Sequence, residues 1–253
     1  QAEDGIRDVE RSRGLGDVYK RQGGGHAAGR VAAAHLLSRR GEDDVIRYLI
    51  WDFDGTLFDT YPAINRAIVA ALEDLGGAAP LNRVAALTRR SIGSCLSRMA
   101  DEFDIDADEL LRRFHLRYRA TSLQKQPPFP GAVAVCQLVN TSGGKNAIVT
   151  HRARTSVERF LDVYQIASLF VDCVTGDDGY PRKPDPSSFE TVMDRNGFVR
   201  RETLAVGDRA LDVRTGRAAG IRTCLFGAPL DGVEPDLVIE DYTELCQFIQ
   251  RMV

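Results

Sequence analysis

Two carboxylates separated by a single residue follow a short apolar segment. They are Asp52 and Asp54 in the pentapeptide DFDGT, which comes directly after YLIW. Because like charges in one crevice repel each other, we expect a cation between or beside these groups. Gly55 lets the backbone turn sharply and come close to a ligand. The alternative is an ordinary acidic turn, in which Asp and Gly are both common.

Two later segments offer a hydroxyl group and a cation. Thr150 ends the apolar segment NAIVT, and its hydroxyl can donate a hydrogen bond to a phosphate oxygen. The alternative is that Thr150 caps the following helix, for which Thr155 is a second candidate. Lys183 lies in PRKPDP, where prolines on both sides stiffen the loop and fix the direction of the ammonium group. A rigidly held cation suits the neutralisation of phosphate, and Arg182 is the competing candidate.

Two more carboxylates follow a third apolar segment. Asp208 ends TLAVGD, and Asp212 comes four residues later, on the same face of the helix that begins there. Carboxylates from separate strand ends, completed by a few waters, are the ligands that Mg²⁺ prefers. Capping of the helix by Asp208 is the structural alternative.

The segments that must position these residues alternate between two patterns. Short apolar segments typical of buried strands occur at 46–53, 146–150, 169–175, 203–208, 221–227 and 236–241. Helical patterns occur between and after them, at 132–140, 155–164, 186–197, 210–220 and 242–252. This alternation predicts an α/β fold with a Rossmann-like parallel sheet covered on both faces. Right-handed crossovers bring the strand ends, and with them the polar residues above, to one edge.

A helical insertion interrupts this alternation after the first strand. Ile64, Ile68 and Leu72 lie on one helical face, and a second helical stretch at 84–103 is expected to break around Gly93. A third helix is expected at 107–120, before the proline-rich QPPFPG. We predict an inserted α-helical cap domain at residues 60–130, and an α/β core at 45–59 and 131–253.

The first 44 residues differ from the rest of the chain. Residues 1–25 are polar, rich in Gly and Arg, and without a sustained hydrophobic period, and RVAAAHLLSRR after them could make a short helix with little to pack against. Part of this stretch resembles translated adaptor sequence, so we expect a disordered or non-native extension and leave it out of the fold prediction.

Composition limits the classes of function. The chain has 253 residues, 43% hydrophobic and 27% charged, with a net charge of −3, so no strong basic field favours nucleic acid. No apolar run approaches the roughly 20 residues that span a bilayer, and no secretory signal pattern is present. The five cysteines are widely spaced, which favours free thiols in a reducing compartment. We therefore expect a cytoplasmic protein with neither a membrane nor a nucleic-acid partner.

Four motifs, in this order, resemble the haloacid dehalogenase-like superfamily: DFDGT, IVTHR, RKPDP and GDRALD. The resemblance covers Val45 to the C-terminus, and the helical insertion fits members with a cap at that place. FPGA and KPDPSSF resemble the phosphoglycolate phosphatase and β-phosphoglucomutase-like branch. Two positions depart from the common pattern: THR stands where TN is more frequent, and GDR where GDS or GDT is frequent.

The resemblance implies a role for each anchor. Asp52 would be the nucleophile that forms an aspartyl-phosphate, and Asp54 would protonate the leaving alcohol and later deprotonate water. Mg²⁺ would be held by Asp52, the backbone carbonyl of Asp54, Asp208 and Asp212, the last directly or through water. The phosphate-binding residues would be Thr150, His151 and Lys183, with Arg90 of the helical insertion as a substrate-reading candidate.

The resemblance therefore predicts a Mg²⁺-dependent phosphoric monoester hydrolase acting on a small phosphorylated metabolite. A phosphosugar mutase of the same superfamily and a non-catalytic phosphate-binding regulatory module are the alternatives. The second Asp of DFDGT favours phosphoryl chemistry over dehalogenation. A homodimer is a further expectation, since cap-mediated dimers occur among similar proteins.

Overall fold

The computed structural model describes residues 45–252, and its centre is a six-stranded sheet in which every strand runs parallel to its neighbours. The strand order is β3-β2-β1-β4-β5-β6. The strands are β1 (Tyr48–Trp51), β2 (Lys145–Val149), β3 (Phe170–Val174), β4 (Thr203–Gly207), β5 (Arg222–Phe226) and β6 (Leu237–Ile239). The predicted α/β fold is confirmed, and the predictions for residues 1–44 fall outside the described residues.

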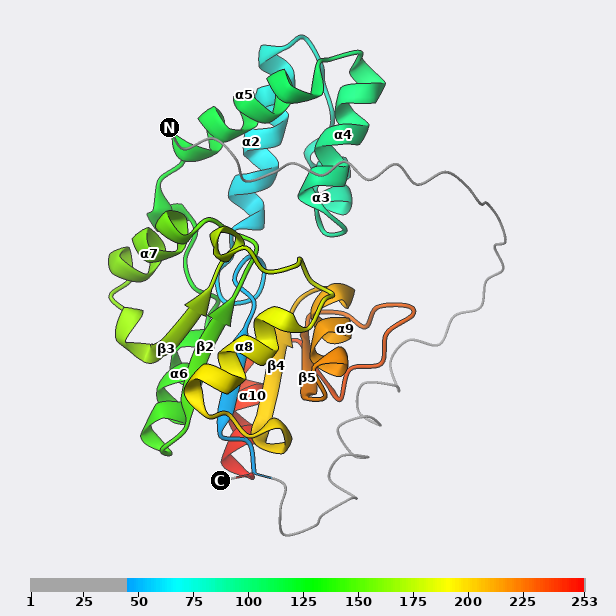
Figure 1. Ribbon diagram of the computed structural model, residues 1–253. Coiled ribbons are helices and arrows are strands. Elements are labelled where there is room, and N and C mark those ends of the chain that lie inside the picture. The colour runs from blue at the N-terminus through cyan, green and yellow to red at the C-terminus, as the bar shows by residue number, and fades with distance from the viewer. Residues whose placement is uncertain (1–44, 253) are drawn as a thin grey trace.

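Helices cover both faces of the sheet, as the alternating pattern predicts. Figure 1 shows α8 in front of the strands and α6 and α10 behind them. On β1, Leu49 and Trp51 pack into the core that includes α6, α7 and α10, whereas Ile50 packs into the core that includes α8. The helices of this part are α6 (Ala132–Thr141), α7 (Arg154–Val163), α8 (Ser187–Asn196), α9 (Ala210–Ala218) and α10 (Tyr242–Gln250). Three short 3-10 turns lie between them, at Ala167–Leu169, Gly176–Asp178 and Arg200–Glu202.

The strand register brings the expected polar residues to one edge. Trp51 of β1 pairs with Ile148 of β2 on one side and with Val206 of β4 on the other. The three central strands thus end at the same level, and Asp52, Thr150 and Asp208 follow these ends within one or two residues. Ligands of open α/β sheets bind at this carboxyl edge.

Residues 60–130, here called the helical segment, form a separate helical layer beyond that edge (Figure 1). The helices are α2 (Tyr61–Asp74), α3 (Leu81–Thr88), α4 (Ile92–Phe103) and α5 (Ala107–Arg119), followed by a 3-10 turn at Leu123–Lys125. Their apolar side chains make a hydrophobic cluster of their own, from Ile64 to Phe114, apart from the two clusters of the sheet. Residues 45–59 and 131–252 are here called the core.

The predicted break in the second helical stretch is confirmed, but Gly93 does not mark it. The second helical stretch breaks at residues 89–91, and Gly93 lies inside α4. The physical reason is a cap, because the Ser91 side chain accepts a hydrogen bond from the backbone N–H of Ser94 and starts the new helix there.

The five cysteines are free, as expected from their spacing. Among residues 45–252, no helix combines the length and apolar character needed to cross a membrane.

Candidate active site

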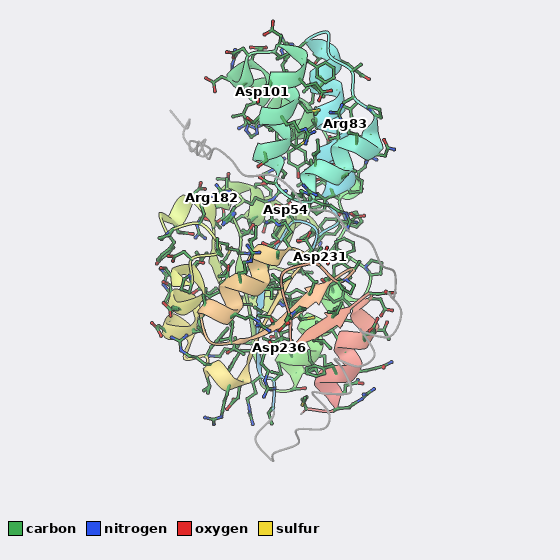
Figure 2. All side chains as sticks on the ribbon, turned by 90° about the vertical axis from the view of Figure 1, so that its right-hand side faces the viewer. Asp54, Arg83, Asp101, Arg182, Asp231 and Asp236 are labelled. Carbon is green, nitrogen blue, oxygen red and sulfur yellow. The ribbon has the colours of Figure 1, made fainter. Side chains whose placement is uncertain are left out.

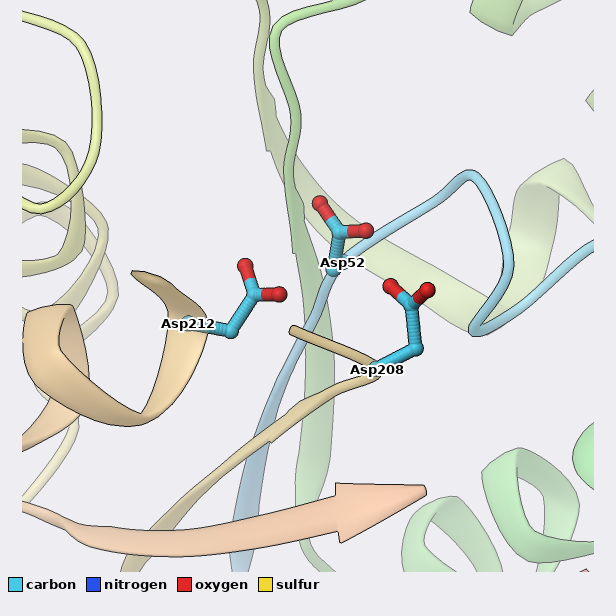
Figure 3. Close-up of side chains that lie close together, drawn as sticks. All are labelled: Asp52, Asp208 and Asp212. Carbon is cyan, nitrogen blue, oxygen red and sulfur yellow. The ribbon is translucent and has the colours of Figure 1, made fainter. Parts of the chain in front are cut away.

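Three carboxylates meet where β1 and β4 end. Asp52 follows β1, Asp208 follows β4 and Asp212 lies in the first turn of α9; an oxygen atom of each lies within 4.8 Å of one from each of the others. Figure 3 shows these side chains converging on one space. Asp52 and Asp212 are almost completely buried, at 3% and 2% exposure. Buried like charges at this separation require positive charge among them.

Lys183 supplies part of that charge. Its Nζ donates hydrogen bonds to Asp52 Oδ1 at 2.7 Å and to Asp212 Oδ1 at 2.8 Å, and its side chain is 1% exposed. Burial alone would lower the pKa of Lys183, but the Asp212 and Asp52 carboxylates outweigh burial and raise it. The lysine is therefore held as a cation between two of the three carboxylates.

The acidic cluster can also hold a metal ion. Asp52 Oδ2 is buried and has no hydrogen-bond partner among the described residues, which is rare for a buried carboxylate oxygen. Burial, with the nearby Asp52 charge, raises the pKa of Asp208 to about 8. A hard divalent cation would satisfy the orphaned oxygen and relieve this repulsion, and carboxylate oxygens are the donors that such cations take. The donor set therefore fits the predicted metal.

Both carboxylate oxygens of Asp212 accept hydrogen bonds, whereas only one oxygen of Asp52 does. Asp212 Oδ1 accepts from Lys183, and its Oδ2 accepts from the backbone N–H of Arg209 at 3.2 Å. The Arg209 side chain lies beside the cluster: its buried Nε has no hydrogen-bond partner among the described residues, but it forms an ion pair with Asp208 Oδ1 at 3.9 Å. Asp212 thus orients Lys183 and the start of α9, and Arg209 adds positive charge that the sequence prediction did not include.

Asp54 lies outside the acidic cluster, at the junction between core and helical segment (Figure 2). Its Oδ1 accepts from Thr60 Oγ1 at 2.7 Å and from an Arg152 terminal nitrogen, and its Oδ2 accepts from Arg152 Nε at 3.1 Å. Burial alone would raise the pKa of Asp54, but the Arg152 guanidinium outweighs burial and lowers it. The two Asp residues of DFDGT therefore occupy different environments, and Arg152 is a site residue that the motif analysis missed.

Thr150 is buried, and its hydroxyl is available to a ligand. Thr150 Oγ1 accepts from the backbone N–H of Arg152 at 3.1 Å, which leaves its proton for donation. The alternative role as helix cap is wrong for both Thr150 and Thr155. Helix α7 has Ala153 at its N-cap, and the first helical N–H, of Arg154, donates to Asp177 Oδ2 at 2.8 Å.

His151 supports the lysine loop. Its Nε2 accepts a hydrogen bond from the backbone N–H of Lys183 at 3.0 Å, and Nδ1 lies 3.2 Å from a terminal nitrogen of Arg182. Burial, with the neighbouring charges of Lys183 and Arg182, lowers the pKa of His151 to about 3. The ring is therefore neutral and positions Lys183 through its backbone; its contact with phosphate stays a prediction.

The remaining predicted residue lies apart from this cluster. Arg90 is exposed in the turn between α3 and α4, and no hydrogen bond or ion pair found in residues 45–252 joins it to the acidic cluster. Its role in reading a substrate stays a prediction, as do the catalytic and binding roles of the other residues.

Comparison with known proteins places these motifs in a family. The family model described as haloacid dehalogenase-like hydrolase matches residues 49–226. A phosphoglycolate phosphatase of Pseudomonas putida is 30% identical over 215 residues, covering 79% of this chain and 78% of that protein. One of Cupriavidus necator is 31% identical over 179 residues, covering 69% of this chain and 78% of that protein.

Solved structures show the same fold. The crystal structure of a predicted phosphoglycolate phosphatase from Haemophilus somnus has a TM-score of 0.70 at 19% identity and covers 80% of this chain and 97% of that one. A putative β-phosphoglucomutase from Thermotoga maritima has a TM-score of 0.69 at 18% identity, with coverages of 82% and 100%. At these identities the likeness extends to the fold alone.

Proposed function

This chain belongs to the haloacid dehalogenase-like hydrolase family, and we propose that it is a Mg²⁺-dependent phosphatase that hydrolyses a small phosphate monoester through an aspartyl-phosphate on Asp52. Its curated relatives named phosphoglycolate phosphatase support a phosphoric monoester hydrolase and make phosphoglycolate the first substrate to test. A cytoplasmic location, a homodimer and the assignment of residues 60–130 as a cap domain stay predictions.

The observation that carries the proposal is the environment of Asp52. One of its oxygens is fixed by Lys183 and the other is buried without a partner among the described residues, beside two further carboxylates. Burial raises the pKa of Asp52, and the Lys183 ammonium opposes this rise. A carboxylate held in this way is oriented and poorly solvated, which suits attack on phosphorus.

In the first half of the reaction, a carboxylate oxygen of Asp52 bonds to phosphorus while the bond from phosphorus to the leaving oxygen breaks. Asp54, whose pKa rises when the negative phosphoryl group binds beside it, gives a proton to that oxygen. In the second half, Asp54 takes a proton from water as the water oxygen attacks phosphorus, which releases phosphate and restores the Asp52 carboxylate. Thr150 and Lys183 would bind the equatorial oxygens, where negative charge is concentrated in the transition state.

Mg²⁺ would be held by Asp52, Asp208 and the backbone carbonyl of Asp54, with Asp212 direct or through water. When bound, it would supply positive charge that offsets the repulsion between Asp52 and the phosphoryl oxygens. Arg90 is proposed to read the part of the substrate that becomes the leaving alcohol.

The test is phosphate release from a panel of monoesters, including phosphoglycolate and p-nitrophenyl phosphate, with and without Mg²⁺. We expect Mg²⁺-dependent turnover that Asp52→Asn reduces on the order of 10⁴-fold or more, as for removal of other catalytic nucleophiles. Asp101→Asn, an exposed position on α4, is the matched control and should retain full activity.

Two outcomes would contradict the proposal. If the wild-type protein releases no phosphate from any monoester, it has the family fold but not the proposed activity. Isomerised product with little free phosphate, from a hexose phosphate and an activating bisphosphate, would identify a mutase instead.

A further inference from the structure

Arg152 joins the core to the helical segment. It follows Thr150 by two residues, and one of its terminal nitrogens donates to the hydroxyl oxygen of Tyr118 on α5 at 2.8 Å. The Tyr118 hydroxyl in turn donates to Gln126 Oε1 at 2.7 Å, beyond the end of the same helix. The contact therefore links a core loop to the last turn of α5, between residues that lie 34 positions apart in sequence.

Every nitrogen of the Arg152 guanidinium donates at least one hydrogen bond. Nε and one terminal nitrogen donate to Asp54, that same terminal nitrogen reaches Tyr118, and the other donates to Ser156 Oγ at 2.8 Å. The side chain is 8% exposed and lies against the rings of Phe53 and Phe160, with centroid distances of 5.3 and 5.0 Å. Such a planar fork, held on all sides, fixes the orientation of the carboxylate it binds.

The pattern distinguishes the two oxygens of Asp54. Oδ1 accepts two hydrogen bonds, from Thr60 and from Arg152, which uses the acceptor positions of a carboxylate oxygen. Oδ2 accepts one, from Arg152 Nε, and keeps one position open. Oδ2 is therefore the oxygen that the arrangement leaves for a proton shared with substrate.

We propose that Arg152 is a positioning residue: it aims Asp54 Oδ2 at the leaving-group oxygen, and Tyr118 aims Arg152, so that proton transfer depends on the helical segment being seated on the core. The inference rests on the proposed function, because Asp54 acts as the acid only in that reaction. The proton leaves Asp54 Oδ2 for the leaving oxygen as the bond from phosphorus to that oxygen breaks.

The test uses substrates that differ in their need for an acid. An alkyl phosphate must be protonated as it leaves, whereas p-nitrophenolate departs without a proton. The ratio kcat/KM reports the steps up to departure of the leaving group, so slow hydrolysis of the aspartyl-phosphate does not mask the effect. A series of aryl phosphates of similar size gives a matched scale of leaving-group ability.

Arg152→Met keeps the length of the side chain and removes its donors. We expect kcat/KM for an alkyl phosphate to fall about tenfold to a hundredfold, and that for p-nitrophenyl phosphate by less than about threefold, since general acid catalysis contributes on that order. The plot of log kcat/KM against leaving-group pKa should become steeper. The matched control is Arg154→Met. The Arg154 guanidinium pairs with Asp178 at 2.7 Å on the core surface, and its loss should not change the ratio of kcat/KM between the alkyl phosphate and p-nitrophenyl phosphate.

Tyr118→Phe tests the link to the helical segment. It should weaken alkyl phosphate turnover in the same direction but by less, because Arg152 keeps its bonds to Asp54. The double variant should be no worse than Arg152→Met, since the two side chains act through one another. Tyr164→Phe removes a comparable hydroxyl that bonds to the Leu123 carbonyl at 2.8 Å, and should leave the substrate selectivity unchanged.

The outcomes separate this inference from the proposed function. Wild-type protein without phosphatase activity defeats the function itself. Active wild type with an Arg152→Met variant that loses all substrates equally, or loses none, overturns the inference, as do additive effects of the two substitutions. If Arg152→Met does not fold, Tyr118→Phe and Arg152→Lys carry the test, and both must show the selective loss on alkyl phosphates.

Discussion

The core and the helical segment both contain pairs of opposite charge, but in different surroundings. Lys183 and Asp52 are 1% and 3% exposed in the core, whereas Arg83 and Glu102, which pair on the helical segment, are 39% and 35% exposed. Water screens the exposed pair, so its loss costs little. Water does not screen the buried pair, so removing one partner leaves an uncompensated charge and lowers the stability of the fold. The Lys183–Asp52 pair thus belongs to the buried site of the core, whereas the Arg83–Glu102 pair belongs to the solvated surface of the helical segment.

Removing the buried lysine gives the largest expected effect. Lys183→Met leaves Asp52 and Asp212 without their shared cation, and breaking a buried pair costs about 3–5 kcal/mol. We expect the metal-free variant to unfold at a much lower denaturant concentration than wild type. Chemical denaturation with EDTA measures this difference, and saturating Mg²⁺ should narrow it by replacing part of the lost charge. A variant as stable as wild type would contradict the argument from burial.

The contribution of Asp208 changes sign with the metal. Its folded pKa of about 8 lies above the usual value of 3.8 for an Asp side chain, so without metal its ionisation opposes folding, and stability falls as pH rises between those values. Metal-free Asp208→Asn should therefore be more stable than wild type at pH 8, and the difference should vanish below about pH 4.

Mg²⁺ should reverse the order of these two proteins. On the proposed function it binds the folded wild type, and it should then stabilise that protein by about 2.7 kcal/mol at a concentration a hundredfold above its dissociation constant. Asp208→Asn, which lacks a ligand, should gain much less. Thermal unfolding with EDTA and with Mg²⁺, followed at both pH values, makes the comparison. Equal gains in the two proteins would place the metal elsewhere.

The difference between the two regions also explains what the sequence could predict. Asp52, Thr150 and Asp208 follow strands, and the strand pattern with its parallel order is enough to bring such residues to one edge. The placement of Lys183 depends on its loop, but the flanking prolines mark that loop as stiff. The fold was therefore predictable in outline from local patterns alone.

Contacts between core and helical segment were beyond such patterns. The bond between Arg152 and Tyr118 depends on how α5 lies against the core, and no periodicity within either segment sets that orientation. The available signal was the unusual tripeptide Thr150-His151-Arg152, in which an arginine follows the phosphate-binding candidate. The break before α4 was predicted, but its position was misjudged, because Ser91 is a stronger signal than Gly93 for the start of a helix.

A smaller effect on stability is expected for substitution of His151, and it tests the cost of burying a positively charged ring. Its folded pKa of about 3 lies below the usual value of 6.5 for a His side chain, so the ring binds a proton more readily when the chain is unfolded. The stability that His151 contributes is complete above pH 6.5 and is lost as pH falls toward 3. His151→Gln should flatten the fall in stability over this window. Denaturation midpoints measured across the window decide it, and identical slopes would mean that the ring is solvated.

The smallest effect is expected for the exposed pair of the helical segment. Arg83→Met removes the partner of Glu102, yet both groups remain in contact with water, which replaces the lost interaction. We expect no measurable change in Tm and none in phosphatase activity, with or without added salt. A loss comparable to that of Lys183→Met would show that exposure does not separate the two regions.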